Sequence, residues 1–600
     1  MAKTKKTRPI RYTSREFQTI KQDLIDHIKR YYPDTFRDFS DASFGSLMVD
    51  SVSYIGDVLS FYLDYQANES FLQTAIEYNN ILKLGKQMGY KSKGAPSAYG
   101  SAALYISVPI SSTGLGPDTN YMPHLLKGSS FSSTSGNTYI LNEDVDFSDP
   151  NNEVRVSEVD NSTGTPTKYA VKAYGEVASG DIIQETHVIG DYEDFRKITL
   201  VNKDVSEILS VVDSEGNEYY ETDFLSQNLL YKAVLNSDSD TSQNTSILKP
   251  FIAARRFTSE RSGRNTVLQF GKSSNIDLPS DDIADPSNVV IDKHGKDYIS
   301  DTTFDPNKIF SNDKFGVAPS NTSLRIKMRV NKTTNTNCRT GQLNKVRRAR
   351  FEFNDLTLAS SAATRNDVTN SLEVDNEEPI IGDVSLPNSD ELKIRIQDSF
   401  SAQNRAVTEN DYKSLIYQMP SKFGSVKRVR IIQDKNSFKR NINLYVVSED
   451  RSGNLVATNS SVKKNMKTWI QGYKMLNDTI DILDAKIVNL GIEFEAISDL
   501  ESNKFELLTN AKAALSNYFS NKADIGEAFF VTDIYSELKK VEGLLDVSKV
   551  RVYQKVGGNY SDIRFNINDS MSADGRYIEM PKNVIYEIKF PSLDIKGVIK

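Results

Sequence analysis

The sequence predicts a multidomain α+β protein, with an N-terminal helical bundle, a central β-rich region and a C-terminal mixed α+β domain. Apolar residues recur at helical spacing over the first 90 residues. From about residue 100 the pattern alternates residue by residue and is rich in turn dipeptides, which favours strands. After residue 386, helix and strand patterns alternate. For a chain of 600 residues we place domain boundaries at 1–93, 94–385 and 386–600.

The N-terminal helical region centres on the run ASFGSLMVDSVSYIGDVLSFYLDYQ at residues 42–66. Its polar residues are spaced by three and four, so they form one narrow line on a helix, here called the polar stripe: Asp50, Ser53, Asp57, Ser60 and Asp64. We expect this stripe to face water or a basic partner. No apolar run reaches 18 residues without a charge, so protein rather than lipid should bury the helix.

The opposite side of this helix is broad and apolar. A helix in a small three-helix bundle exposes about half of its surface, and this one has far less polar surface than that. We therefore expect other subunits to cover it, through an apolar face made of Leu47, Val52, Ile55, Leu59, Tyr62 and Leu63.

Two neighbouring helices complete the predicted bundle. Thr13 and Glu16 have the spacing of a capping box, with Thr13 at the N-cap and Glu16 three residues later, ahead of a helix that ends near Pro33. A third helix is expected from about residue 70 to 88, with Gly89 after its end.

The C-terminal region predicts helices on one face of a single mixed sheet. Thr408 is expected to cap a helix that carries Asp411 in its first turn and packs Tyr412 inward. The polar segments 275–315 and 360–385 are candidate linkers or insertions.

No motif in the sequence marks a catalytic centre. Four histidines (His27, His124, His187 and His294) are each more than ten residues from the next, and the single cysteine, Cys338, excludes an internal disulfide or a multi-cysteine zinc site. No glycine-rich phosphate loop occurs. We expect a non-enzyme with no cofactor and no metal, although 80 acidic residues leave a carboxylate pair for glycoside hydrolysis open.

The charge of the chain bears on its partners. A net charge of −7 does not attract nucleic acid. The basic segment 345–350 is better explained as a strand with one charged face. There is no apolar signal segment at the N-terminus and no candidate membrane span, so neither nucleic acid nor a membrane is an expected partner.

Several strings resemble one family in order along nearly the whole chain. They include SFYLDYQANESFLQTAIEYNN and LGKQMGYKSKGAPSAYGSA near the start, and SAQNRAVTENDYKSLIYQMPSKFGSV in the last third. The most specific part is R-x-V-T-x-x-D-Y, at Arg405, Val407, Thr408, Asp411 and Tyr412. The sequence is similar to the baseplate wedge subunit of contractile-tailed (myovirus) bacteriophages, of the baseplate J family.

This resemblance implies a structural subunit of the virion tail baseplate, synthesised in the cytoplasm of the host bacterium. It implies a dimer within a wedge, contacts that join wedges into the inner baseplate ring around the hub, and a helical bundle shared with other wedge proteins. Sheath-initiating and hub-proximal baseplate proteins are further implied partners. The alternative is a tail-associated cell-wall glycosidase or a receptor-binding adhesin.

Overall fold

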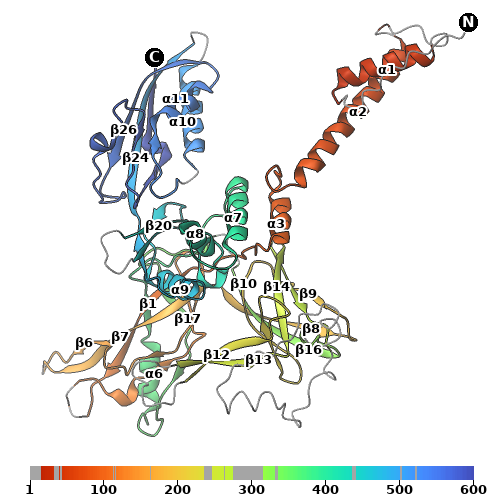
Figure 1. Ribbon diagram of the computed structural model, residues 1–600. Helices are drawn as coiled ribbons and strands as arrows, with labels where there is room; N and C mark the ends of the chain where they lie inside the picture. Colours follow the sequence, from red (N-terminus) through yellow and green to blue (C-terminus); the bar gives the residue numbers. More distant parts are fainter. Residues whose placement is uncertain are drawn as a thin grey trace, which may run out of the picture. The chain divides into compact units, whose positions relative to one another are not determined.

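The protein divides into two compact units, which are described separately below (Figure 1). One contains residues 1–91 and 387–400, and the other contains residues 92–386 and 401–600. The predicted multidomain α+β class is confirmed. The computed structural model describes residues 15–32, 40, 43–112, 114, 116–162, 164–235, 246–262, 264–273, 315–331, 335–434, 441–499, 503–520 and 523–600.

The first unit consists of two helix pairs. Helix α1 (Phe17–Tyr31) packs along α2 (Phe44–Glu69), and α3 (Tyr78–Gln87) packs against α7 (Ser389–Ala402). The core between α3 and α7 contains Ala75, Ile81, Tyr90, Leu392 and Ile396. The element that opens the predicted C-terminal domain therefore lies with the N-terminal helices.

Two predicted helix ends differ from the structure. The N-cap of α1 is Glu16, whose amide N–H donates to Thr19 Oγ1 over 3.3 Å; the predicted cap, Thr13, lies outside the described residues. The third helix begins at Tyr78 rather than near residue 70, because the Glu69 carboxylate accepts from the amides of Ile76 and Glu77 and holds that segment in a turn. Gly89 follows the end of α3 with φ +88°, as predicted.

The second unit contains a first seven-stranded sheet. Its order is β17 (Leu343–Arg348), β3 (Ser130–Ser133), β4 (Thr138–Leu141), β7 (Pro166–Ser179), β1 (Tyr99–Pro109) and β19 (Glu373–Asp375), with β6 (Glu153–Val159) also paired to β7. The two ends of this order meet: the Gly341 amide donates to Asn376 O over 2.9 Å, and the Leu343 amide donates to Asn376 Oδ1. The sheet thus curls around a core that includes Leu104, Phe131 and Tyr139.

Smaller elements complete this layer. Helix α6 (Ala362–Asn370) packs on β1, and a three-stranded sheet has the order β18 (Phe351–Glu352), β2 (His124–Leu125), β5 (Val145–Asp146). The prediction of a linker at 360–385 is wrong, because α6 and β19 occupy it and Val368, Leu372 and Ile380 are buried in the core. The predicted basic strand exists as β17, but both of its faces are exposed after Leu343. The candidate linker at 275–315 lies almost entirely outside the described residues.

A second seven-stranded sheet has its own core. Its order is β8 (Asp181–Ile189), β16 (Thr322–Val330), β10 (Val205–Val212), β11 (Glu218–Glu221), β14 (Arg256–Ser262), β15 (Asn265–Phe270) and β9 (Lys197–Thr199). Its buried side chains include Phe257, Phe270 and Ile326. Strands β12 (Leu229–Leu235) and β13 (Ser246–Ile252) form a separate two-stranded ribbon.

The last 200 residues form two sheets, not the single mixed sheet that the sequence suggested. The first has the order β20 (Arg428–Gln433), β21 (Ile442–Glu449), β22 (Leu455–Val456), with β23 (Ile480–Asp484) parallel to β21. Helices α8 (Glu409–Tyr417) and α9 (Ser460–Gln471) cover it. Asn459, at the N-cap of α9, donates to Tyr99 O, so this layer is joined to β1 of the central region.

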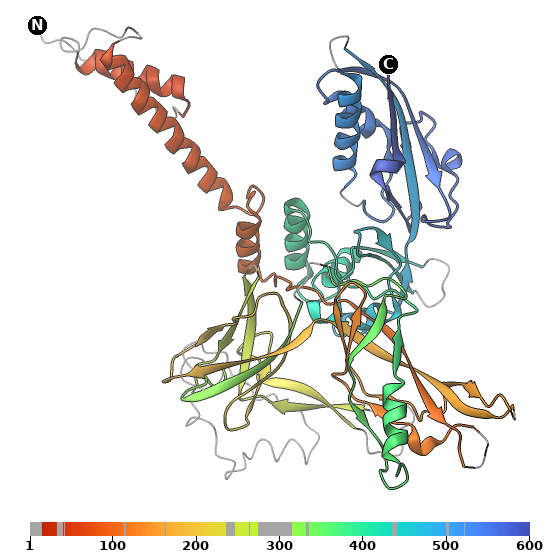
Figure 2. The same cartoon turned by 180° about the vertical axis from the view of Figure 1, so that it is seen from behind.

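The final sheet has the order β26 (Leu544–Lys555), β24 (Lys486–Ser498), β28 (Val584–Glu587), with β29 (Ile595–Ile599) parallel to β24. Helices α10 (Lys504–Tyr518) and α11 (Val531–Lys539) lie along one face, as Figures 1 and 2 show from opposite sides. The short pair β25 (Phe529–Phe530) and β27 (Tyr577–Ile578) and the single-turn helices α12 (Ile567–Ser570) and α13 (Pro591–Asp594) complete this layer. The chain passes from one sheet to the other within two residues, since β23 ends at Asp484 and β24 begins at Lys486.

Candidate functional site: the exposed face of helix α2

Helix α2 is fixed at both ends by side-chain hydrogen bonds. Ser43 is the N-cap, and its Oγ accepts from the Ser46 amide over 3.1 Å. At the other end the carboxylate of Glu69 accepts from Asn80 Nδ2 over 2.9 Å and from the Ile76 amide over 2.8 Å, which lowers the pKa of Glu69. These contacts set where the helix begins and how the chain leaves it.

The polar stripe of α2 faces α1, which corrects the prediction that it faces water or a partner. Asp50 Oδ1 lies 2.7 Å from Lys21 Nζ, and Asp64 Oδ1 lies 2.6 Å from Arg15 Nη1. Ser53 is completely buried, and its hydroxyl donates a hydrogen bond to Val49 O over 2.7 Å. The expected basic neighbour of the stripe is therefore α1 of the same chain.

Small residues let the two helices approach on this side. Gly45, Ser46 and Ser53 are buried, and a Cβ added to Gly56 would lie 3.3 Å from Ile20 Cδ1. An α-helix packs closest where its side chains are short, so the glycines and serines, rather than the leucines, determine the contact with α1. The signal that sequence reasoning missed is the charge match between Lys21 or Arg15 and the stripe.

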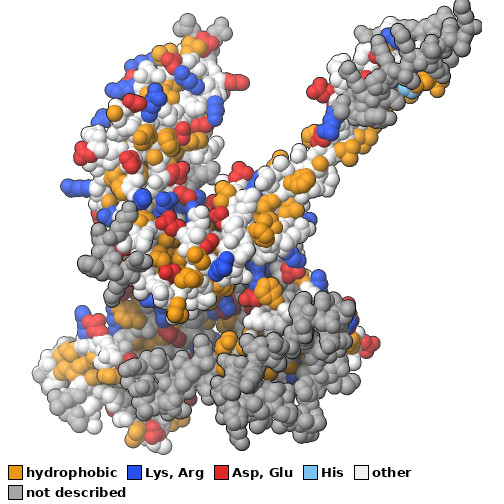
Figure 3. Space-filling view, viewed as in Figure 1, with side chains coloured by type: hydrophobic (Ala, Val, Ile, Leu, Met, Phe, Trp, Pro, Cys, Tyr) orange, Lys and Arg blue, Asp and Glu red, His pale blue; other side chains and the backbone are white. Residues whose placement is uncertain are grey.

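The predicted apolar face points away from α1 and is exposed in the part of the chain that the structure describes. Its six side chains have exposed fractions between 48% for Val52 and 71% for Leu63. Further exposed apolar residues extend it on the same helix: Phe44, Met48, Tyr54 and Phe61. Figure 3 shows hydrophobic side chains along the length of this helix. Contiguous apolar surface on this scale is typical of an interaction site.

Burial of this face would stabilise a complex substantially. Removing one Leu or Ile side chain from water contributes about 1.5–3 kcal/mol, before the cost of ordering the partners. Residues 55, 59, 62 and 63 lie at helical spacing of three and four, as an apolar stripe that packs against another helix requires. The geometry suits helix–helix association rather than the binding of a small molecule.

The family-motif residues lie in the second unit, at the start of α8. Thr408 is the N-cap, and the Asp411 amide donates to Thr408 Oγ1 over 3.3 Å. In return, Asp411 Oδ2 accepts from the amides of Thr408 (2.8 Å) and Val407 (3.1 Å). Tyr412 is buried and donates to Asp478 Oδ2 over 2.5 Å, and burial raises its pKa. These predicted local roles are confirmed, while Arg405 and Val407 are exposed.

Residues that could carry chemistry are held in structural contacts. Burial raises the pKa of the Cys338 thiol to about 11, so it stays protonated at neutral pH. His187 Nε2 lies 2.8 Å from Glu185 Oε2, His124 Nδ1 lies 3.6 Å from Asp146 Oδ1, and His27 packs on Tyr31. The fourth histidine, His294, is outside the described residues.

Two kinds of site are not found in the described part of the chain. No group of three or more His, Cys, Asp or Glu side chains there is placed to hold a metal ion. Among the helices described, none combines the length and apolar character needed to cross a bilayer.

Comparison with known families gives a match in the N-terminal region. Residues 16–87, which span α1, α2 and α3, match the model of the N-terminal domain of bacteriophage baseplate proteins. The exposed face of α2 lies within the segment that matches this model. A comparison with curated proteins finds no match.

Two solved baseplate structures show a weak similarity. A chain of the anti-feeding prophage baseplate, a six-fold symmetrised cryo-EM structure, matches with a TM-score of 0.25 and 10% identity over 94% of this chain and 90% of that chain. A chain of the TssK–TssF–TssG baseplate subcomplex of the type VI secretion system matches with a TM-score of 0.22 and 8% identity, over 73% of this chain and 96% of that chain. Both TM-scores are too low to establish a common fold.

Proposed function

We propose that this protein is a non-catalytic structural subunit of a bacteriophage contractile-tail baseplate, of the wedge type, and that it assembles through the exposed face of α2. The observation that carries the proposal is the position of this face: about ten large apolar side chains are uncovered on one helix, inside the segment that matches a baseplate N-terminal domain. The protein would be made in the cytoplasm of the host bacterium and reside in the virion tail.

The proposed partners follow from the shape of the face and from the resemblance of the sequence to wedge subunits. A broad apolar face along a 26-residue helix suits a helical bundle, formed with a second copy of the chain and with another wedge protein. Incorporation into an inner ring around the hub requires a second, different contact, since one self-complementary face gives only a closed dimer. Sheath-initiating and hub-proximal proteins are the proposed further neighbours.

The apolar face is tested by Leu59→Asp on the full chain. Placing an unpaired carboxylate in a buried contact costs several kcal/mol, so we expect loss of self-association. The measurement is mass by light scattering after size exclusion, across a hundredfold range of concentration. Leu358→Asp is the matched control, because Leu358 is exposed to a similar degree (61% against 58%) but lies outside α2.

Both variants should keep the wild-type far-UV circular dichroism, because neither leucine is buried within the chain. A wild-type protein that stays monomeric at every concentration, or a Leu59→Asp variant that associates as the wild type does, would refute this interface. The ring is tested separately by electron microscopy of particles that contain the chain: density for it outside the inner baseplate would rule out that part of the proposal.

A further inference from the structure

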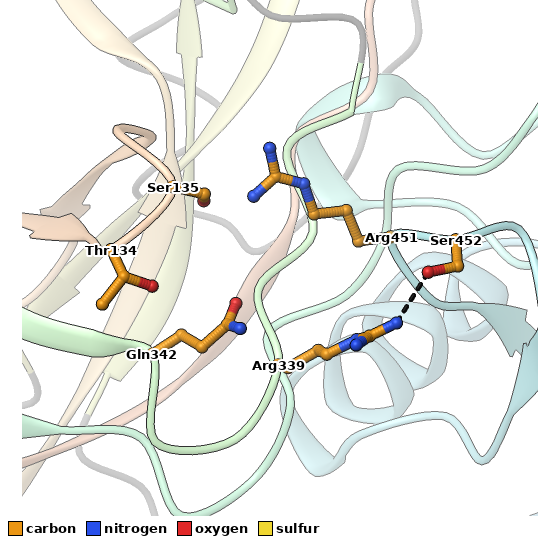
Figure 4. A pocket seen from close by; sticks show the side chains of 6 residues that line it. All are labelled: Thr134, Ser135, Arg339, Gln342, Arg451 and Ser452. Atoms are coloured by element: carbon orange, nitrogen blue, oxygen red, sulfur yellow. Dashed lines mark hydrogen bonds between the residues drawn. The ribbon is translucent and has the colours of Figure 1, made fainter. Parts of the chain in front are cut away.

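Three β-turns of the second unit converge on a polar pocket of about 470 Å³. Its lining comes from segments far apart in the sequence: Thr134, Ser135, Arg339, Gln342, Arg451 and Ser452. Figure 4 shows Thr134 and Ser135 on one side, Arg339 and Ser452 on the other, and the Arg451 side chain extended toward Ser135. Polar side chains on turns held by a sheet scaffold are a common form of binding site.

The two outer turns are rigid. In the β3–β4 hairpin the Ser133 amide donates to Asn137 O over 2.9 Å, and Gly136 takes φ +85°. In the turn between β21 and β22, Asp450 Oδ1 accepts from the Ser452 amide over 2.7 Å, and Gly453 takes φ +78°. The positive φ angles favour glycine and fix both turn types.

The middle turn, residues 339–342, is tied to both neighbours. Gln342 O accepts from the Thr134 amide over 2.9 Å, and Arg339 Nη2 donates to Ser452 Oγ over 2.6 Å. Asn335 Nδ2 also donates to Arg451 O over 2.7 Å, which holds the third turn against this segment. The pocket is therefore organised before any ligand arrives, which reduces the entropic cost of binding.

The charges around the pocket leave an excess of one positive charge. Two guanidinium groups, on Arg339 and Arg451, face one carboxylate, on Asp450. Asp450 lies 3.7 Å from Arg339 and already accepts from the amides of Ser452 and Asn454. Within the described residues, Arg451 forms no ion pair with a carboxylate, whereas Arg339 pairs with Asp450.

We propose that this pocket binds a single carboxylate, presented as an Asp or Glu side chain on the surface of a partner protein. The planar guanidinium of Arg451 can donate two parallel hydrogen bonds to one carboxylate. The hydroxyls of Thr134 and Ser135 and the amide of Gln342 stand around the same space. An excess of one charge matches a carboxylate monoanion better than a phosphate dianion.

Phosphate and nucleic acid fit the pocket less well. Phosphate cradles use several free backbone N–H groups, whereas here the Thr134 amide is bound to Gln342 O and the Gly136 amide to Ser133 O. Among the described residues, no aromatic side chain lines the pocket for a base to stack on, and the chain is acidic overall.

The experiment uses the full-length protein and small probes. Saturation-transfer NMR detects weak binding of N-acetylglutamate amide, a monoanion that mimics a glutamate on a protein surface. N-acetylglutamine amide, which is neutral and has the same shape, is the control ligand. Inorganic phosphate is the third ligand tested, and its binding is measured from the width of its ³¹P line. We expect binding of the glutamate probe only, and at least about tenfold weaker binding to Arg451→Gln. The matched control is Arg551→Gln, an exposed arginine on β26, which should bind as the wild type does.

Equal binding of both amides, binding of phosphate without the glutamate probe, or an Arg451→Gln variant with unchanged affinity would each overturn the proposal. Folding is checked by thermal melting, and Arg451→Gln should melt as the wild type does because its side chain is exposed. Ser135→Asp is a second variant, which supplies a carboxylate from within the chain and should also abolish probe binding. The assay involves the chain alone, so its failure leaves the baseplate proposal unaffected.

Discussion

Helices α2 and α10 both have apolar residues at helical spacing, but these residues are buried in α10 and mostly exposed in α2. In α10 the apolar residues Leu507, Ala511 and Leu515 are buried against the C-terminal sheet. In α2, a helix of 26 residues, Val49 is the only large apolar residue that is buried. The apolar period predicts a helix in both places, but among the described residues only the apolar side of α10 is covered.

The difference lies in what each helix has beside it. A four-stranded sheet offers α10 a wide apolar surface, and the two close around a shared core. Among the described residues, helix α2 packs along α1, which is 15 residues long, has no fully buried residue, and presents Lys21 and Arg15 to the polar stripe. Its apolar side is exposed, so under the assembly proposed above the structure of the N-terminal unit should depend on assembly far more than that of the C-terminal layer does.

The same substitution at the two helices should give opposite results, and this is the largest expected effect. Leu515→Ala leaves a cavity in a closed core and should lower the free energy of unfolding of the C-terminal layer by about 2–5 kcal/mol. Leu59→Ala removes an exposed side chain and should change the unfolding of the monomer by less than about 0.5 kcal/mol. Urea unfolding of dilute protein measures both.

The two variants should show the reverse order of effects on self-association. Leu59→Ala should raise the concentration needed for self-association, whereas Leu515→Ala should leave it unchanged at temperatures where the layer is folded. A large loss of monomer stability in Leu59→Ala would mean that α2 is covered within the chain, and the contrast between the two helices would fail.

A partly buried carboxyl in the second unit, on Asp383, gives the next largest effect on stability. Burial raises the pKa of Asp383 to about 6, with a smaller contribution from the nearby charge of Glu449. Asp383 Oδ2 accepts from the Thr336 amide over 2.8 Å and from its hydroxyl over 3.2 Å. Because the folded pKa lies above the unfolded value near 3.9, the stability that the protonated group contributes is complete below about pH 4 and is lost as the pH rises through 6.

Asp383→Asn should remove this loss. An amide oxygen can still accept from Thr336, and the charge is gone, so the variant should be more stable than the wild type by roughly 1–3 kcal/mol at pH 7.5 and nearly equal to it at pH 4. Thermal melting at the two pH values measures the difference. If Asp383→Asn raised the stability equally at both pH values, the gain would come from packing rather than from the loss of an ionised carboxylate.

Much of the local structure could be predicted from the sequence because its signals are local. Thr408 and Asp411 lie three residues apart and form the predicted cap, and Gly89 follows the end of α3 as predicted. The apolar face of α2 was also correctly placed away from the stripe, and all six of its residues are exposed.

What could not be predicted depends on contacts between distant residues. Nothing near Asp50 shows that Lys21 lies against it, and nothing near Asp484 shows that the strands on its two sides belong to different sheets. The pocket formed by turns at 134, 339 and 451 has no local signature, because each turn resembles any other polar turn. Only the topology of the sheets brings the two arginines together.

The cap of α8 should give a smaller effect. Thr408→Ala removes the acceptor of the Asp411 amide and should cost about 0.5–2 kcal/mol, whereas Thr408→Ser should retain most of the stability. Hydrogen exchange of the first-turn amides of α8 measures the loss directly. Unchanged protection in Thr408→Ala would show that packing of Tyr412 alone holds this end of the helix.

The smallest effect belongs to the ion pairs between α1 and α2. Lys21 and Asp50 are 23% and 39% exposed, and Arg15 and Asp64 are 65% and 49% exposed. Exposed pairs contribute about 0.2–1 kcal/mol and weaken in salt. A double-mutant cycle with Lys21→Met and Asp50→Asn should give a coupling energy in that range in dilute protein, and the Arg15–Asp64 cycle should give a lower value.

Repeating these double-mutant cycles in the assembled state tests which side of α2 contacts the partner. Because the stripe faces α1 and the apolar face points away, assembly through the apolar face should leave both coupling energies nearly unchanged. If assembly instead raised the Lys21–Asp50 coupling above about 2 kcal/mol, or removed its salt dependence, the pair would have become buried. The contact with the partner would then lie over the α1 side of α2, and not on the side where Leu59 stands.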